Sequence, residues 1–313
     1  MDATIAYYDP PRRPVPGDRP DFTNLPLSGK PVEVADMRGR DFSRRSLDRE
    51  GFAFVAAPTA VRDFYDRDEV QRVYAAEAAG LLRDLTGCAA TAVLNTPVVR
   101  VSDRVGERPA GTTFTGDFVH ADFSAAAAEY MLRRNLPPDE AQERLRSRYA
   151  VYNVWRAFSG PPQDVPLALC DTQSIAPEDK QYCTITMKSA SGEVMTWENI
   201  TYLHSQRHRW WSCADMTPDE AYVFRSFDSD PGRAEQVPHS AFVNHSCPAS
   251  APPRPSTCSA GTCRRTRRRP ACGAGTPCST SGGRSPGRRR MCRWRCATRG
   301  ASRPRTSSTA RSR

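Results

Sequence analysis

Apolar residues recur at steps of three and four between Asp66 and Leu85, and this period predicts the first helix of the chain. Gly87 follows, where a glycine commonly ends a helix. Two shorter helices are expected later: one runs through Ala125–Arg134 with Ser124 as a good N-cap, and the other, after a pair of prolines, covers about Asp139–Ser147.

From Tyr149 onward the pattern changes to short segments rich in aromatic and β-branched residues, with turn-forming sequences between them. The segments are Tyr149–Phe158, Val165–Asp171, Tyr182–Lys188, Val194–His204, Arg209–Ala214 and Ala221–Phe227. Strands at this spacing indicate an antiparallel sandwich or barrel. Ala90–Ser102, also rich in β-branched residues, is expected as one more strand.

The order of elements predicts a mainly β fold with packed helices, an α+β class. Residues 1–50 contain many prolines and no clear period, so we expect an extended N-terminal arm, parts of which could pack as short strands. The folded domain is expected over residues 51–254. Residues 255–313 have no hydrophobic period and form a basic low-complexity tail.

Charge separates this tail from the rest of the chain. The chain has 45 Lys and Arg against 35 Asp and Glu, but residues 251–313 contain 17 Arg and no Lys or acidic residue. The first 250 residues therefore carry a net charge of −7. A GC-rich gene read out of frame produces this composition. The alternatives are a genuine disordered tail and a basic arm for nucleic acid, of which the last is the least favoured because lysine is absent.

Eleven cysteines are present, six of them in the tail, and none forms a CxxC pair. This argues against a zinc ribbon or a thioredoxin-like site. The N-terminal segment lacks the apolar stretch of a secretory signal, and no run of 18 apolar residues could cross a membrane. We therefore expect a cytoplasmic protein with free thiols.

The five histidines suggest a metal site. His120 and Asp122 form an H-x-D, and on a strand such residues project to the same face. His239 follows the strand-rich region and is the best candidate for a third ligand. Two histidines and a carboxylate leave three adjacent positions open on an octahedral ion, which suits Fe(II) because a cosubstrate and O₂ must bind together. Alternatively, the H-x-D lies at the surface and Asp122 caps the next helix.

Fifteen residues after His239 comes Arg254-Pro-Ser256. An enzyme that uses 2-oxoglutarate must hold its distal carboxylate, and an arginine fork with a hydroxyl donor does this well. Arg254 could instead be the first of the many arginines of the tail.

Several short motifs occur in an order that resembles a known family. They are His120-x-Asp122, Tyr152-Asn-Val-Trp-Arg156, Pro166-Leu-Ala-Leu-Cys-Asp171, His208-Arg-Trp-Trp211, Met216-x-Pro-x-Glu220, Phe227-Asp-Ser229 and Pro238-His-Ser-Ala-Phe242. Over about residues 50–256 the chain resembles the natural-product hydroxylase/desaturase family, which includes the cephalosporin 7α-hydroxylase component of cephamycin synthesis and the fungal asaB-type enzymes.

The resemblance implies a non-haem Fe(II)/2-oxoglutarate oxygenase with a double-stranded β-helix, or jelly-roll, core. By position, His120, Asp122 and His239 match the iron ligands, and Arg254 and Ser256 match an R-x-S that binds 2-oxoglutarate. In the family this R-x-S opens a final strand. Here the basic tail follows instead, so we expect the jelly roll to be incomplete at its C-terminus.

Four further residues are candidates for substrate contacts: Trp155, Arg156, His208 and Trp210. Arg156 would fix a carboxylate or carbonyl, or else form a structural ion pair, for example with Asp171. His204 and His208 form an H-x₃-H, but no glutamate of a zinc hydrolase lies between them, so a lining or packing role is preferred.

The expected function is hydroxylation or desaturation of a small natural-product substrate with Fe(II) and 2-oxoglutarate as cofactors. The alternative is a non-catalytic partner subunit of a biosynthetic complex, because the cephamycin component works with a partner protein, or an inactive frameshifted copy.

Overall fold

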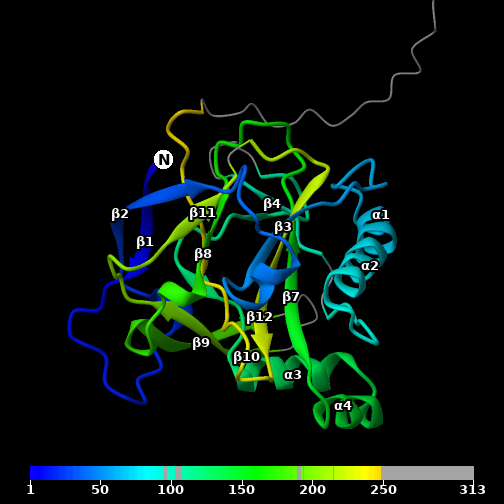
Figure 1. The fold of residues 1–313 in the computed structure, drawn as a ribbon. Helices are drawn as coiled ribbons and strands as arrows, with labels where there is room; N and C mark the ends of the chain where they lie inside the picture. The colour runs from blue at the N-terminus through cyan, green and yellow to red at the C-terminus, as the bar shows by residue number, and fades with distance from the viewer. Residues whose placement is uncertain (95–96, 103–107, 189–191, 193, 214, 248–313) are drawn as a thin grey trace, which may run out of the picture. The chain divides into compact units, whose positions relative to one another are not determined.

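The computed structural model describes residues 1–94, 97–102, 108–188, 192, 194–213 and 215–247. All of these belong to one compact unit, Met1–Cys258, and the rest of the chain, Ser259–Arg313, lies outside the described residues. Within this unit two sheets provide most of the regular structure, and helices pack beside them (Figure 1).

The larger sheet has eight strands and curls until its first strand approaches its sixth. In order across the sheet, the strands are β1 (Asp2–Tyr8), β2 (Leu27–Asp36), β11 (Trp210–Ser212), β8 (Leu167–Cys170), β13 (His239–Ala241), β6 (His120–Ala121), β10 (Val194–Tyr202) and β9 (Lys180–Lys188). Neighbours are antiparallel except β2 and β11. The curl brings Ala6 of β1 beside Phe118, and the Val119 amide donates to the Ala6 carbonyl.

A three-stranded antiparallel sheet packs against one face of the larger sheet. It contains β3 (Phe52–Ala56), β12 (Glu220–Asp228) and β7 (Ala150–Trp155), with β12 in the middle. Phe52 and Phe224 from this sheet share a core with Leu167 and Leu169 of β8. Burial of these side chains holds the two sheets together, since each buried side chain of this size contributes about 1.5–3 kcal/mol.

The other face of the larger sheet has its own core. Ile5 and Tyr7 of β1 are fully buried there with Tyr202 of β10 and Trp210 of β11. Successive strand residues point to opposite faces, so neighbouring residues of one strand belong to different cores. β8 shows this directly, because Leu169 lies in the core between the sheets while Cys170 lies in the core inside the curl.

The helices cover the edges and the outer face of the small sheet. They are α1 (Arg67–Glu69), a π-helical turn (Val70–Tyr74), α2 (Ala75–Thr86), α3 (Ala125–Asn135) and α4 (Pro138–Leu145). Short 3₁₀ turns cover Phe22–Asn24, Arg44–Asp48, Thr172–Ser174 and Pro177–Asp179. Leucines of α2 pack on the outer face of β12 and β7, and α3 packs beside β10. Across the described residues, no helix combines the length and apolar character needed to cross a membrane.

The predicted helices are confirmed. The first runs continuously from Arg67 through the π-helical turn to Thr86, and Gly87 ends it with a φ of +69°. The Ser124 side chain accepts a hydrogen bond from the Ala127 amide, as expected of an N-cap.

All six strands predicted after Tyr149 are present, each within a few residues of the expected bounds. The strand predicted over Ala90–Ser102 is wrong for most of its described residues, because only Arg100–Val101 (β4) pairs, with Thr113–Phe114 (β5). Val93 and Val98 are exposed and have no sheet to pack against, so β-branched composition alone was insufficient.

Residues 1–50 differ most from expectation. Instead of an extended arm, they supply β1 and β2, which form one side of the large sheet through seven paired positions. Ala3, Ile5 and Tyr7 alternate with exposed or partly exposed residues, so β1 has the period of a half-buried strand. The N-terminal segment is therefore part of the folded domain.

Candidate metal centre

Two neighbouring strands of the large sheet place two histidines side by side. His120 on β6 lies directly opposite His239 on β13, and Asp122 follows two residues after His120. His239 is also opposite Leu169, a member of the core between the sheets. All three side chains therefore project into the space between the sheets, where a ligand is shielded from bulk water.

The three side chains converge without hydrogen-bonding one another. His120 Nε2 is 3.8 Å from Asp122 Oδ1, and His239 Nε2 is 3.8 Å from Asp122 Oδ2. One ligand atom from each of the three residues lies within 4.8 Å of the others. These separations are too long for hydrogen bonds but short enough for one ion to contact all three groups.

Each imidazole is oriented by the segment that leads into its own strand. His120 Nδ1 bonds to the Phe118 carbonyl at 2.8 Å, and His239 Nδ1 bonds to the Val237 carbonyl at 3.1 Å. In both cases the acceptor is two residues earlier in the chain. A carbonyl only accepts, so each Nδ1 donates and each Nε2 keeps its lone pair toward the triad, as a metal ligand requires.

The electrostatics favour neutral histidine and an ionised carboxylate. Burial, followed by repulsion from His239, lowers the pKa of His120 to about 4. Burial alone would raise the pKa of Asp122, but attraction to His239 and His120 and a hydrogen bond from Asn153 outweigh it and hold that pKa below its usual range. At neutral pH the triad therefore presents a neutral His120 and an anionic Asp122, which together with the imidazole of His239 form a donor set that fits Fe(II).

The small sheet supports the triad from the opposite side. Asn153 on β7 and Phe224 on β12 are a cross-strand pair, so their side chains lie on the same face. Asn153 Nδ2 donates to Asp122 Oδ2 at 2.5 Å, and the Phe224 ring lies 4.8 Å from the His239 ring. The two sheets therefore meet at the triad through one polar and one apolar contact.

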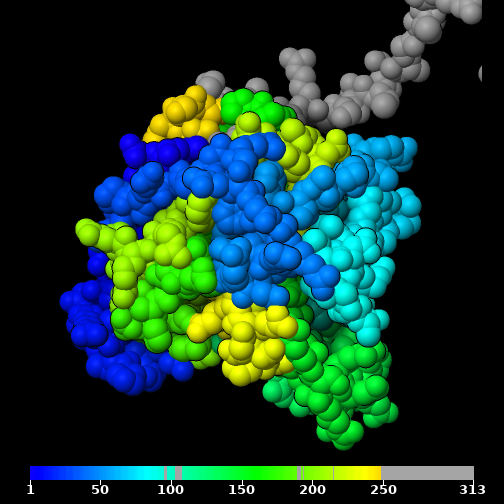
Figure 2. Space-filling view, in the orientation of Figure 1, coloured from blue at the N-terminus to red at the C-terminus, as the bar shows by residue number. Residues whose placement is uncertain are grey.

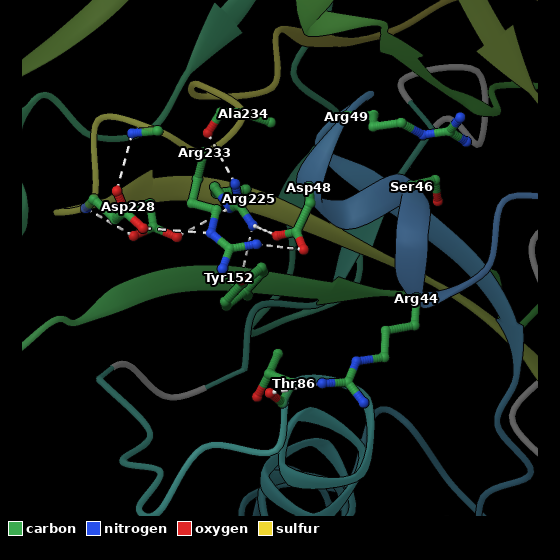
Figure 3. Close-up of polar contacts among 12 residues, drawn as sticks. Arg44, Ser46, Asp48, Arg49, Thr86, Tyr152, Arg225, Asp228, Arg233 and Ala234 are labelled. Carbon is green, nitrogen blue, oxygen red and sulfur yellow. Dashed lines mark hydrogen bonds and ion pairs between the residues drawn. The ribbon is translucent and has the colours of Figure 1, made fainter.

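An arginine on the outer face of the small sheet fixes the loop that leads to His239 (Figure 3). Arg225 on β12 is fully buried, and its guanidinium donates to the Ala234 carbonyl, to Asp48 and to the Tyr152 hydroxyl. Its backbone carbonyl accepts from the Val237 amide. Arg225 thus holds both ends of the segment immediately before His239.

Carboxylates balance the guanidinium groups of this network. Arg148 forms two bonds with Asp228, and Arg233 pairs with Asp48 and Asp230. In the space-filling view the loop after β12, drawn in yellow, lies at the surface below the blue segment that precedes β3 (Figure 2). Because each of these two arginines is matched by acidic groups, we assign the network a structural role.

Of the predicted substrate-contact residues, Trp155 lies on the side of the triad. It is two residues from Asn153 on β7, therefore on the same face, and its ring stacks on Tyr222 at 5.4 Å. Arg156 lies elsewhere: its guanidinium donates to the carbonyls of Ala57 and Pro218 at the end of the small sheet. The alternative ion pair with Asp171 is wrong, because Asp171 binds Arg209.

His208 and Trp210 do not join the triad. Trp210 lies opposite Cys170 and so faces the core inside the curl, on the other side of the sheet from His239. Its indole donates to the Tyr7 hydroxyl at 2.9 Å, and Tyr7 also bonds to His208. These two side chains belong to a buried polar network that secures β1, and their substrate role stays a prediction.

Arg254 and Ser256 lie outside the described residues, as does any closing strand after them. Among the described residues, Cys88 is exposed, whereas Cys170, Cys183 and Cys213 are buried thiols. Burial raises the pKa of Cys170 and of Cys213 to about 12, whereas an activated nucleophile has a lowered pKa.

Sequence reasoning missed Asn153 and Phe224. The sequence contained a signal for Asn153, because an asparagine inside a strand of apolar and aromatic residues is uncommon and needs a hydrogen-bond partner when buried. Phe224 gave no separate signal, since it ends the apolar run 221–224 of β12, all of whose residues are buried.

The described fold agrees with comparisons to known proteins. A family model described as "Oxidoreductase/YMDC permease-like domain" matches residues 5–258. A hydroxylase/desaturase from Cercospora beticola is 31% identical over 67% of this chain and 69% of its own length. An Fe(II)/2-oxoglutarate-dependent dioxygenase from Aspergillus novofumigatus, NvfI, is 28% identical over 67% of this chain and 74% of its own length.

The chain belongs to the hydroxylase/desaturase family of oxidoreductases. A solved structure of NvfI, titled an iron and α-ketoglutarate-dependent endoperoxidase, superimposes with a TM-score of 0.67 at 22% identity. The match covers 80% of this chain and 93% of that one, and it establishes the expected jelly-roll fold. The family resemblance predicted from the short motifs is confirmed.

Proposed function

We propose that this hydroxylase/desaturase family member is an Fe(II)- and 2-oxoglutarate-dependent oxygenase that hydroxylates or desaturates a small natural-product substrate. The observation that carries the proposal is the convergence of His120, Asp122 and His239 between the two sheets. Bound iron would supply dioxygen activation and couple the oxidation of 2-oxoglutarate to that of a substrate C–H bond.

The role of this chain is to hold and shield the reacting groups. His120 and His239 would bind the metal through Nε2, with their rings fixed by backbone carbonyls. Phe224 and Trp155 line the same side of the small sheet, and Phe22 lies edge-on to His120 with ring centres 5.7 Å apart. These aromatic groups keep water away and favour an apolar substrate.

For the cosubstrate we propose that Arg254 and Ser256 bind the distal carboxylate of 2-oxoglutarate. The support comes from the sequence alone: a guanidinium fork suits a carboxylate, and the arginine stands fifteen residues after His239. Re-sequencing the gene across codons 250–262 tests whether the basic tail arises from a change of frame. A frame that restores an apolar strand after Arg254 would support cosubstrate binding at this place.

A metal-dependent oxygenase should lose activity and metal binding together when a ligand is removed. We expect His120→Ala to abolish Fe(II) binding and 2-oxoglutarate-dependent oxygen uptake, measured with anaerobically loaded protein in an oxygen electrode. His245→Ala is the matched control, because His245 is exposed and does not belong to the triad. Unchanged iron binding in the His120 variant would refute the assignment.

The same measurement separates the enzyme from a non-catalytic partner subunit. A catalytic protein consumes oxygen and 2-oxoglutarate, whereas a partner subunit with the same fold consumes neither, whatever metal it binds. We place the protein in the cytoplasm, since the buried thiols of Cys170, Cys183 and Cys213 suit a reducing compartment.

A further inference from the structure

Asn153 joins the two sheets at the triad. It lies on β7 of the small sheet, and its Nδ2 donates to Oδ2 of Asp122, just beyond β6 of the large sheet, at 2.5 Å. An ionised carboxylate only accepts hydrogen bonds, so the amide nitrogen, rather than its oxygen, faces Asp122. The bond is therefore charge-assisted and short.

Without this bond the carboxylate could bind a metal in two ways. Its two oxygens face different histidines, since Oδ1 is 3.8 Å from His120 Nε2 and Oδ2 is 3.8 Å from His239 Nε2. Carboxylates bind ions through one oxygen or through both. Binding through both would fill one more position on a six-coordinate ion and leave two open positions instead of three.

We infer that Asn153 is a positioning residue that restricts Asp122 to metal binding through Oδ1. This inference rests on the proposed Fe(II) site and deepens it. With Oδ2 bonded to the amide, three metal positions stay open, which is the number required when 2-oxoglutarate binds through two atoms and dioxygen through one.

A neutral amide suits this task better than a charged donor. A lysine or arginine at this place would neutralise Asp122 and weaken its attraction for a cation, whereas the amide leaves the full negative charge on the carboxylate. Asn153 is also paired with Phe224 across β7 and β12, and Phe224 packs on His239. The donor to Asp122 and the ring that contacts a second ligand therefore come from one cross-strand pair.

The test replaces the donor by an apolar group of similar size and measures the metal alone. Co(II) is the probe, because its visible absorption reports the number and arrangement of its ligands. For Asn153→Leu we expect a 10- to 100-fold loss of Co(II) affinity, the usual effect of removing a group that orients a metal ligand, together with a changed visible spectrum. Asn153→Gln keeps the amide on a longer side chain, so it should recover part of the Co(II) affinity and part of the wild-type spectrum.

Asn244→Leu is the matched control. Asn244 is buried, and its Nδ2 donates to the Gln163 carbonyl at 3.1 Å. The Asn244→Leu substitution should reduce the melting temperature, as the loss of a buried hydrogen bond does. It should leave the Co(II) affinity and the Co(II) spectrum unchanged. If Asn153→Leu fails to fold, Asn153→Ser serves instead, because its hydroxyl is too short to reach Asp122.

The outcomes separate this inference from the proposed function. Wild-type Co(II) affinity and spectrum in a folded Asn153 variant, with binding lost in His120→Ala, would overturn the positioning role and leave the metal site intact. Binding that survives in His120→Ala would overturn the metal site itself.

Discussion

At the scale of single residues, buried polar groups differ in what they do according to which face of the large sheet they occupy. On the face toward the small sheet, the imidazoles of His120 and His239 bond through Nδ1 to carbonyls two residues earlier in the chain, so both Nε2 atoms stay available. On the other face, both ring nitrogens of His208 are engaged, by the Tyr7 hydroxyl and by Asp179. A histidine without an available nitrogen is a structural residue.

His208 should make stability depend on pH. Burial lowers the pKa of His208 from its usual value near 6.5, and the bond to Asp179 opposes this only in part. The folded state therefore binds the proton less readily than the unfolded state. Neutral His208 therefore contributes a stabilisation of the fold that is complete above about pH 6.5. It is lost as pH falls through the lower folded pKa, and it amounts to about 1.4 kcal/mol for each pH unit by which folding lowers that pKa.

Urea unfolding of metal-free protein at pH 7.5 and 5.5 measures this effect. We expect His208→Gln to reduce the loss of unfolding free energy between the two pH values, at some cost in stability at pH 7.5. His245 is exposed, so His245→Ala should leave the pH dependence of the unfolding free energy as it is in the wild type. An unchanged slope in the His208 variant would show that other groups cause the acid loss.

At the scale of elements, the segment between β12 and β13 matters because it positions His239. Arg225 holds this segment through the Ala234 carbonyl and the Val237 amide. For Arg225→Met we expect a loss of about 3 kcal/mol in unfolding free energy, since removing a buried charge leaves its partners uncompensated. Metal affinity should fall as well, because the carbonyl that orients His239 belongs to Val237.

Arg233→Met provides the comparison for this variant. Arg233 lies in the same network, but its side chain is 37% exposed and its partner Asp48 is 47% exposed. Exposed ion pairs contribute about 0–1 kcal/mol, so this variant should be nearly as stable as the wild type. Equal losses in the two variants, measured by urea unfolding, would show that burial of Arg225 is not the cause.

Features that depend on residues close together in the sequence could be predicted, whereas features that depend on distant segments could not. The helix ending at Gly87 and the H-x-D of β6 depend on residues a few positions apart, and both were predicted. His239 could be chosen because only five histidines exist. The bond between Asn153 and Asp122 could not be predicted, because it depends on how two separate sheets face each other, and no local pattern encodes that register.

At the scale of the whole molecule, the N-terminal strand closes the large sheet next to the metal centre. The alternation of Ala3, Ile5 and Tyr7 was visible in the sequence, but the prolines that follow suggested an arm. Most of those prolines, from Pro10 to Pro26, belong to the connection between β1 and β2, outside the paired positions of these two strands. An extended connection and a buried strand therefore coexist within the first 36 residues.

Deletion of Asp2–Tyr8 should abolish cooperative folding and not merely weaken it. Ile5 and Tyr7 are fully buried, and loss of two such side chains removes about 3–6 kcal/mol, a large part of the 5–15 kcal/mol that stabilises a typical domain. The deletion also leaves the Trp210 indole and His208 without the Tyr7 hydroxyl, which costs further free energy because both are buried.

The same deletion should disturb the metal centre even in molecules that stay compact. The Ala6 carbonyl accepts the Val119 amide, one residue before His120, so β1 fixes the start of β6. We expect thermal unfolding monitored by circular dichroism to lose its sharp transition and Co(II) binding to disappear. Replacing residues 11–16 by a glycine-serine segment of equal length is the control, because these residues are mostly exposed. A deletion variant that melts like the control would show that the large sheet closes without β1.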